Sequence, residues 1–134
     1  MSYLLDTNVI SELARPHPDA GVLDWFNLQS EIATSSICIE ELSYGIAHAK
    51  PAQHRRLIAW FEALLALPAE IVPVDAKIAR VSGDLRALRE RAGRPVAQAD
   101  MLIAATALLS GRTLVTRNTR DFEACGVALL NPYT

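Results

Sequence analysis

Four acidic residues stand at positions where a carboxylate is costly unless it does chemistry. Asp6 directly follows a short apolar run, and Asp121 comes soon after another one near the end of the chain. Asp100 is the only charged residue in a long apolar segment, and Glu41 lies early in a segment with helical spacing. Aspartate is disfavoured in strands, and an unpaired buried carboxylate is expensive. These four positions therefore define the first candidate site.

An ordinary structural role competes with chemistry at each position. Asp6 or Asp100 would serve as the N-cap of the helix that follows, since aspartate is a favoured N-cap residue. After Asp6, however, Thr7 and Asn8 already offer capping side chains, which favours a functional role for Asp6. A single helical glutamate such as Glu41 usually lies on a solvated face of its helix.

The polar segment that contains Asn118 and Asp121 also has a plain structural interpretation, because Asn and Asp both favour turns. Its chemical interpretation depends on the sheet. If the strand ends converge, Asp6, Glu41, Asp100 and either Asn118 or Asp121 line one pocket.

Such a pocket would suit a divalent cation. Carboxylates held close together repel one another and raise one another's pKa, and a bound cation removes that penalty. Mg²⁺, or Mn²⁺ in its place, prefers oxygen ligands and keeps several waters, which leaves room for a phosphate. The predicted chemistry is metal-assisted hydrolysis of a phosphodiester. The chain has no glycine-rich phosphate loop, which excludes a P-loop NTPase.

The elements that must position these residues alternate between strand and helix. Helices are predicted between the strands, with Pro51 opening one, Asp75 capping another and a nearly all-apolar one over 96–110. This alternation predicts a three-layer α/β/α sandwich with a short parallel sheet of four to five strands, in which chemistry sits at the carboxyl ends of the strands. Pro73 favours an edge position for its strand. The strands are predicted at 2–5, 32–35, 70–74, 113–116 and 128–130.

The composition fits one globular domain. The chain has 134 residues, of which 51% are hydrophobic and 21% charged, and we predict a single domain over 1–134. Cys38 and Cys125 each lie in an apolar stretch, which favours buried free thiols in a reducing compartment. No signal peptide and no membrane-spanning segment are apparent, so we expect a cytoplasmic protein without membrane contact.

The net charge of −2 argues against wholesale electrostatic capture of nucleic acid. A local basic patch is still compatible with it, because eleven of the 13 cationic residues are Arg. Arg contacts phosphate through two donors at once. Two groups are candidates for phosphate contacts, the second favoured because it adjoins the predicted site: Arg86, Arg89, Arg91 and Arg94, or Arg112, Arg117 and Arg120.

Four short motifs in this order resemble those of the PIN-domain proteins, particularly the VapC- and FitB-like toxins. Each is weak alone, but together they cover essentially the whole chain. They are LLDTNVISE at 4–12, Glu41-Leu42 followed by Gly45, ADMLIAATA at 99–107, and LVTRN at 114–118 with Asp121-Phe122. Asn131-Pro132 resembles the usual ending of the family.

The resemblance implies a PIN-like fold and a Mg²⁺-dependent endoribonuclease, the toxin of a type II toxin–antitoxin pair. Carried over by motif, Asp6 and Asp100 would hold the metal, and Glu41 would help orient the attacking water. Some members have Asp where this chain has Asn118. The resemblance therefore leaves open whether Asn118 or Asp121 fills the fourth acidic position.

The resemblance also implies partners. It predicts a homodimer, an RNA substrate and a cognate antitoxin encoded nearby, which would block the acidic pocket, often with a basic side chain. Opposite charge makes such an inhibitor effective. By the same resemblance, Thr7 and Thr116 would contact the acidic residues without contacting the metal.

Two other functions compete with the ribonuclease. One is a catalytically inactive PIN-like module that binds RNA or a protein, which the uncharged Asn118 motivates. The other is a phosphoryl-transfer domain with Asp6 as acceptor. Haloacid-dehalogenase-like proteins would need a second Asp where this chain has Asn8. The receiver interpretation lacks the paired acidic residues and the late lysine.

Overall fold

Five short parallel strands form one sheet in the computed structural model, which describes residues 2–134. Their order across the sheet is β3-β2-β1-β4-β5, and every neighbouring pair is parallel. This confirms the predicted parallel sheet, although the strands are one or two residues shorter than predicted. They are β1 (Tyr3–Leu5), β2 (Ala33–Ser35), β3 (Glu70–Val72), β4 (Thr113–Val115) and β5 (Leu129–Leu130).

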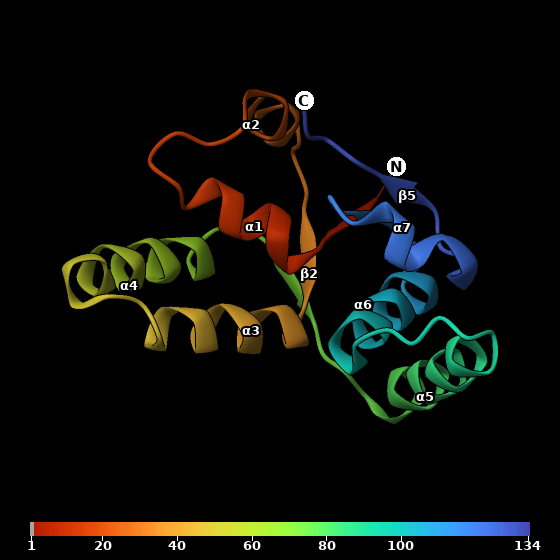
Figure 1. The fold of residues 1–134 in the computed structure, drawn as a ribbon. Coiled ribbons are helices and arrows are strands. Elements are labelled where there is room, and N and C mark those ends of the chain that lie inside the picture. The colour runs from red at the N-terminus through yellow and green to blue at the C-terminus, as the bar shows by residue number, and fades with distance from the viewer. Residues whose placement is uncertain (1) are drawn as a thin grey trace.

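Helices cover both faces of this sheet, so the predicted three-layer sandwich is confirmed (Figure 1). In Figure 1, α3 (Ser36–Ala47) and α4 (Pro51–Leu65) lie on one side, and α5 (Ala76–Arg91) and α6 (Gln98–Leu109) on the other. The remaining helices are α1 (Thr7–Leu13), α2 (Ala20–Asn27) and α7 (Thr119–Phe122), which a 3-10 turn at Glu123–Cys125 follows.

The strand order reverses direction between β1 and β4. The chain moves from β1 to β2 and β3 on one side, and then returns through α5 and α6 to β4 and β5 on the other. A crevice at such a switch point, outside the carboxyl ends of the strands, is where open α/β sheets bind ligands. Leu5 pairs with Val115, so the residues that follow β1 and β4 emerge side by side.

Several local predictions are confirmed. Pro51 occupies the first turn of α4, where its missing N–H costs nothing. The Asp75 side chain accepts the Ile78 N–H at 2.8 Å and caps α5. Pro73 has no backbone N–H to donate, and it lies just past β3, which forms an edge of the sheet.

Three predicted helix starts are wrong in detail. Asp6 itself is the N-cap of α1, so Thr7 and Asn8 did not displace it from that role. Ser35 rather than Ser36 caps α3. The helix predicted over 96–110 begins at Gln98 as α6 with Ala97 as its N-cap, so Asp100 lies within its first turn and not at its cap. Asp100 is therefore free of a capping role.

The hydrophobic core joins the sheet to several helices, among them α1, α3 and α6, and α6 is as central to it as its apolar pattern predicts. Six residues of α6 are buried, and Ile103 and Ala104 are fully inaccessible. Cys38 and Cys125 are buried free thiols, which confirms the prediction for both. Within residues 2–134, no helix combines the length and the apolar character needed to cross a membrane.

Candidate active site

Asp6 lies at the switch point of the sheet, directly after β1. Its side chain is only 4% exposed, and three donors hold its carboxylate. The Thr7 N–H donates at 2.7 Å, the Thr116 hydroxyl at 2.8 Å and the Asn8 amide nitrogen at 3.3 Å. A carboxylate this deeply buried and this fully bonded is poorly placed to accept a phosphoryl group, which argues against the phosphoryl-transfer hypothesis.

Thr116 links the two sides of the switch point. It follows β4 and is fully buried, and its hydroxyl both donates to Asp6 and accepts the Asn118 N–H at 3.0 Å. The register of β1 and β4 explains this contact, because Leu5 and Val115 are paired one residue earlier. The supporting role expected for Thr116 therefore has a direct geometric basis.

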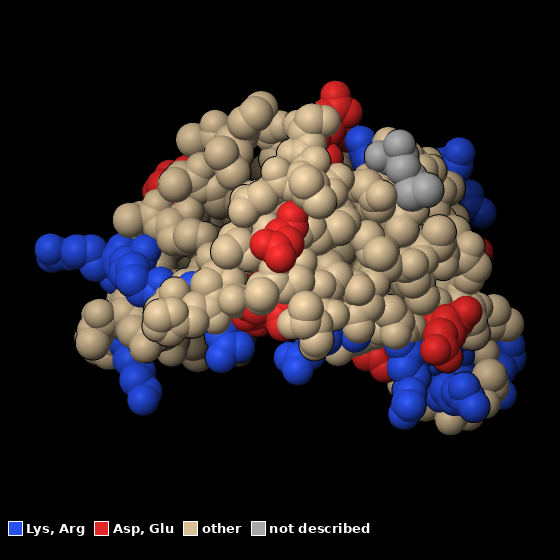
Figure 2. Space-filling model, turned by 90° about the horizontal axis from the view of Figure 1, so that it is seen from above, with Lys and Arg blue, Asp and Glu red and all other residues tan. Residues whose placement is uncertain are grey.

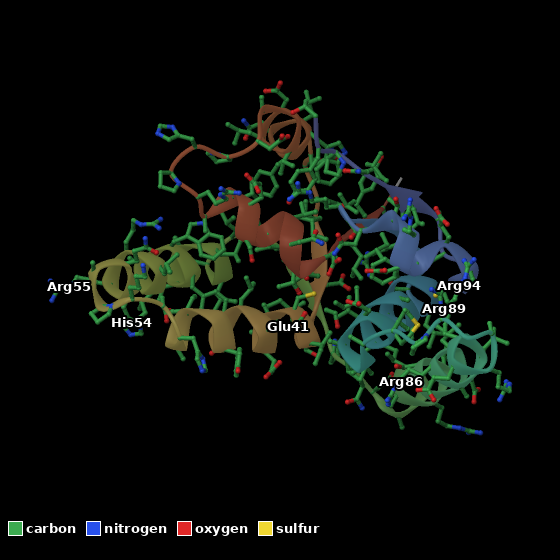
Figure 3. The ribbon with its side chains drawn as sticks, viewed as in Figure 1. Glu41, His54, Arg55, Arg86, Arg89 and Arg94 are labelled. Atoms are coloured by element: carbon green, nitrogen blue, oxygen red, sulfur yellow. The ribbon has the colours of Figure 1, made fainter. Side chains whose placement is uncertain are left out.

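Glu41 reaches the same place from α3. It is half-buried, and its Oε1 atom accepts the Thr7 hydroxyl at 2.6 Å. Thr7 thus contacts Asp6 through its backbone and Glu41 through its side chain. Glu40, one residue earlier, is exposed. In Figure 3 the labelled Glu41 lies on the half of α3 that is nearer the centre of the molecule.

Asp100 enters from the first turn of α6 and is half-buried. Burial raises the pKa of its carboxyl to about 6, and the charges of Asp6, Asp121 and Glu41 add to that rise. Burial also raises the pKa of Asp6 above its usual value. The Thr116 and Thr7 bonds oppose that rise, and the charges of Glu41 and Asp121 add to it. The charges of Glu41 and Asp121 thus act on both Asp6 and Asp100, which brings the four carboxylates into one electrostatic environment.

Asp121 and Asn118, the two candidates for the fourth acidic position, differ in burial and in charge. Asp121 lies in α7, is half-buried, and its charge raises the pKa of both Asp6 and Asp100. Asn118 is exposed, and its bond to this region comes from its backbone N–H.

Among residues 2–134, no cationic side chain forms an ion pair with this acidic cluster, which consists of Asp6, Glu41, Asp100 and Asp121. In the part of the chain that the structure describes, the two ion pairs join Arg15 to Glu12 and Arg112 to Glu70. Over the same residues, no hydrogen bond to the Asp100 carboxylate is found, and no group of three His, Cys, Asp or Glu side chains is arranged to hold a metal ion. Mg²⁺ usually takes one or two protein carboxylates and retains its waters, so this all-oxygen, uncompensated cluster fits such an ion without a closed cage.

The arginine candidates divide by position. Arg112 precedes β4, at the end of the sheet away from the acidic cluster, and is paired with Glu70 at 3.1 Å. Arg112 therefore lies away from the site, and the prediction that it adjoins the site is wrong. Arg117 lies two residues past the end of β4, after Thr116, and is exposed. Figure 2 shows Lys and Arg gathered mainly at the edges of one face, whose middle is largely uncharged.

The other arginine group lies on α5 and in the turn after it. In the view of Figure 3, Arg86, Arg89 and Arg94 are on the far side of α6 from Glu41. Arg89 is only 6% exposed, and its Nε donates to the Arg94 carbonyl at 3.4 Å. Arg89 is therefore turned inward and is not available to a phosphate, whereas Arg91 and Arg94 are exposed.

Two residues of the site were not identified from the sequence. The sequence pattern predicts only a capping role for Asn8, yet its side-chain amide donates to Asp6 and accepts the backbone N–H of Arg117 at 3.3 Å. Tyr133 donates its hydroxyl to the Asn8 carbonyl at 3.0 Å, across 125 positions of sequence. The amide two residues after Asp6 was a usable signal for Asn8, whereas no local pattern indicates Tyr133.

Comparison with known proteins identifies the class to which this fold and site belong. The PIN domain family matches residues 3–127, so the chain belongs to the PIN-domain family. The resemblance given by the four motifs is therefore confirmed.

Individual relatives are similar over nearly their whole length. The chain is 40% identical to the VapC ribonuclease Y4jK of Sinorhizobium fredii, over 97% of this chain and 96% of that protein. The crystal structure of FitAcB from Neisseria gonorrhoeae matches with a TM-score of 0.85 and 35% identity, over 97% of both chains. A toxin-antitoxin complex from Klebsiella pneumoniae matches with a TM-score of 0.73 and 26% identity, over 98% of both chains.

Proposed function

We propose that this protein is a metal-dependent endoribonuclease and acts as the toxin of a type II toxin–antitoxin pair. The observation that carries the proposal is the convergence of four carboxylates, uncompensated by any described cation, at the switch point of the sheet. The VapC ribonuclease among its relatives supports RNA as the substrate.

Asp6 and Asp100 would hold Mg²⁺, with Mn²⁺ as a substitute. They enter from two different elements, the end of β1 and the first turn of α6, and the charge of Asp6 helps to raise the pKa of Asp100. Asp121 is the better candidate for the fourth acidic position, since it brings a charge and Asn118 does not. A bound divalent ion would supply a water of lowered pKa and would neutralise charge that develops on phosphorus.

The side chains of the protein orient the reactants. Thr7 fixes Oε1 of Glu41, which leaves Oε2 to accept a proton from the attacking water. Thr116 and Asn8 fix the rotamer of Asp6, and the Thr116 hydroxyl also opposes the rise in its pKa, because donors to a carboxylate favour its charged state.

The antitoxin would cover an apolar groove on the opposite side of the molecule from α5. This groove, the α2–α4 groove, has a volume of about 300 Å³ and is lined by Leu13, Leu23, Phe26, Asn27, Trp60, Ala63, Leu64 and Leu67. Leu23 and Leu67 are 38% and 46% exposed. An amphipathic helix fits such a surface, because its apolar stripe would complete the burial of α4. The Klebsiella toxin-antitoxin complex supports a partner of this kind.

The homodimer expected from the resemblance belongs to the same proposal. Sedimentation of the purified chain at several concentrations tests it independently of activity. A monomer at every concentration would remove the dimer from the proposal and leave the nuclease untouched.

A catalytically inactive RNA- or protein-binding module is the second candidate. Two observations favour it, namely the exposed, uncharged Asn118 and the lack of a closed metal cage in residues 2–134. Tight RNA or partner binding without any cleavage would support this module.

Cleavage of total cellular RNA by purified, antitoxin-free protein tests the proposal. We expect discrete products with Mg²⁺, none with EDTA, and none with Asp6→Asn. Expression in cells should arrest growth, and Asp6→Asn should relieve that arrest. Unchanged cleavage by the folded Asp6→Asn variant, or in EDTA, would contradict the proposed function.

A further inference from the structure

A chain of contacts connects the C-terminal segment to the acidic cluster. The Asn8 side chain bridges Asp6 and Arg117. Its amide nitrogen donates to the Asp6 carboxylate, and its amide oxygen accepts the backbone N–H of Arg117. The Tyr133 hydroxyl holds the backbone carbonyl of the same Asn8 at 3.0 Å. Tyr133 therefore supports the segment that orients the first acidic residue.

The ring of Tyr133 has a second contact. The guanidinium carbon of Arg117 lies 5.0 Å from the centroid of this ring, which is a cation–π geometry. The hydroxyl and the ring of one residue thus hold Asn8 and Arg117 together. Burial raises the pKa of the Tyr133 phenol above its usual value, so its hydroxyl remains protonated and can donate at neutral pH.

The segment that carries Tyr133 is itself fixed on α2. The Thr134 hydroxyl donates to Asp19 at 2.7 Å, and the Thr134 N–H donates to the same carboxylate at 3.1 Å. A Cβ at Gly21 would lie 2.4 Å from the Pro132 carbonyl oxygen, so the backbone passes α2 at a distance that only glycine permits. The backbone that carries Tyr133 is therefore held in place against α2.

Arg117 is the arginine whose charge this arrangement leaves available. It is exposed, and no carboxylate pairs with it within the described residues. Arg112, by contrast, is paired with Glu70 at the other end of β4. An arginine that is aligned on an aromatic ring still presents its N–H donors to a phosphate.

We infer that Arg117 contacts a phosphate of the RNA beside the acidic cluster, and that Tyr133 is the positioning residue that aims it. This inference rests on the proposed function for the identity of the ligand. The carboxylates repel phosphate, whereas Arg117 attracts it. In this inference the C-terminal segment serves to position Arg117 through Tyr133.

Equilibrium binding of a short fluorescent single-stranded RNA in EDTA tests the inference without requiring cleavage. Arg117→Gln should weaken binding about threefold to tenfold and reduce the slope of log Kd against log salt by about 0.7, the contribution of one phosphate contact. Arg55→Gln is the matched control, since it makes the same charge change at an exposed position. Figure 3 shows Arg55 at the end of α4, pointing away from Glu41.

Tyr133→Leu distinguishes positioning from a general structural effect. It should weaken RNA binding by about threefold in the parent protein and have no further effect in the Arg117→Gln background, because it acts through Arg117. Tyr133→Phe keeps the ring and should bind RNA as the parent does. Arg117 is exposed, so Arg117→Gln decides alone if Tyr133→Leu does not fold.

Three results would overturn the inference: an unchanged Kd and salt slope for Arg117→Gln, equal losses from Tyr133→Leu in both backgrounds, or no RNA binding by the parent protein. The proposed function fails separately. RNA that binds through Arg117 but is never cut with Mg²⁺ would remove the nuclease and keep the inference. If the parent protein cleaves RNA with Mg²⁺ and Arg117→Gln binds RNA as tightly as the parent, the nuclease is kept and the inference about Arg117 is removed.

Discussion

The two helices α4 and α6 are both rich in apolar residues, yet the structure uses them in opposite ways. Half of the twelve residues of α6 are buried between the sheet and α5. No residue of α4 is buried, although its fifteen residues are all described and several pack partly on the core. One helix completes the fold, and the other leaves an apolar face only half covered.

This difference separates stability from recognition. Burial of α6 holds Asp100 where the charge of Asp6 raises its pKa, so the core and the acidic cluster both depend on this helix. The partial exposure of α4 does little for the isolated chain but offers apolar area that a partner can bury. Substitutions in the two helices should therefore change different properties.

A matched pair of isoleucines gives the largest expected effect on stability. Ile103→Ala in α6 removes a side chain with no solvent exposure and should lower the free energy of unfolding by about 3 kcal/mol. Ile58→Ala in α4, where the side chain is 42% exposed, should cost less than about 1 kcal/mol. Urea unfolding of both variants measures this, and equal losses would break the comparison.

A second pair tests whether the α2–α4 groove binds the antitoxin. Leu67→Asp in the groove should weaken antitoxin binding at least about tenfold, since it places a charge in an apolar contact. Leu88→Asp is the control, because Leu88 is similarly exposed at 49% but lies on α5 in the other layer. Calorimetric titration of each variant with the cognate antitoxin gives the two affinities. Antitoxin affinity lowered equally by both would place the partner elsewhere.

The smallest predicted effect concerns pH and the acidic cluster. Because the pKa of folded Asp100 is raised from 3.8 to about 6, its contribution to stability is fully present below pH 3.8 and is lost as pH rises through 6. In EDTA at pH 7.5, Asp100→Asn should therefore be more stable than the parent by about 1 kcal/mol, a figure reduced for its partial exposure.

Unfolding of both proteins in EDTA at several pH values measures this difference, which should vanish near pH 4. Saturating Mg²⁺ should reverse its sign at pH 7.5, because only the parent keeps both metal-binding aspartates. A difference that is constant with pH would show that burial and repulsion do not act on Asp100.

Much of this fold was predictable because it depends on patterns along the chain. Apolar runs and helix caps located all five strands, and the alternation of strand and helix implied a parallel sheet. Because ligands bind at the carboxyl ends of parallel strands, the position of Asp6 directly after β1 then indicated that it belongs to the site. The caps were less predictable, since Asp6 serves both as a cap and as a member of the cluster.

The parts that were missed depend on contacts between distant segments. Tyr133 meets Asn8 and Arg117 only after the whole sheet has formed, so no spacing in the sequence marks it. The prediction that Arg112 adjoins the site is wrong because the whole length of β4 lies between Arg112 and Arg117. The roles of Asn118 and Asp121 likewise depend on how α7 packs.

Two adjacent glutamates provide the most direct test of the central claim, that the acidic cluster at the switch point cleaves RNA. Glu41 contacts Thr7 inside the cluster, whereas Glu40 is exposed and outside it. In single-turnover cleavage of RNA with Mg²⁺, we expect Glu41→Gln to lose at least about 10²-fold in rate, in the range for a general base. Glu40→Gln should retain the parent rate. Equal rates for the two folded variants would contradict the account.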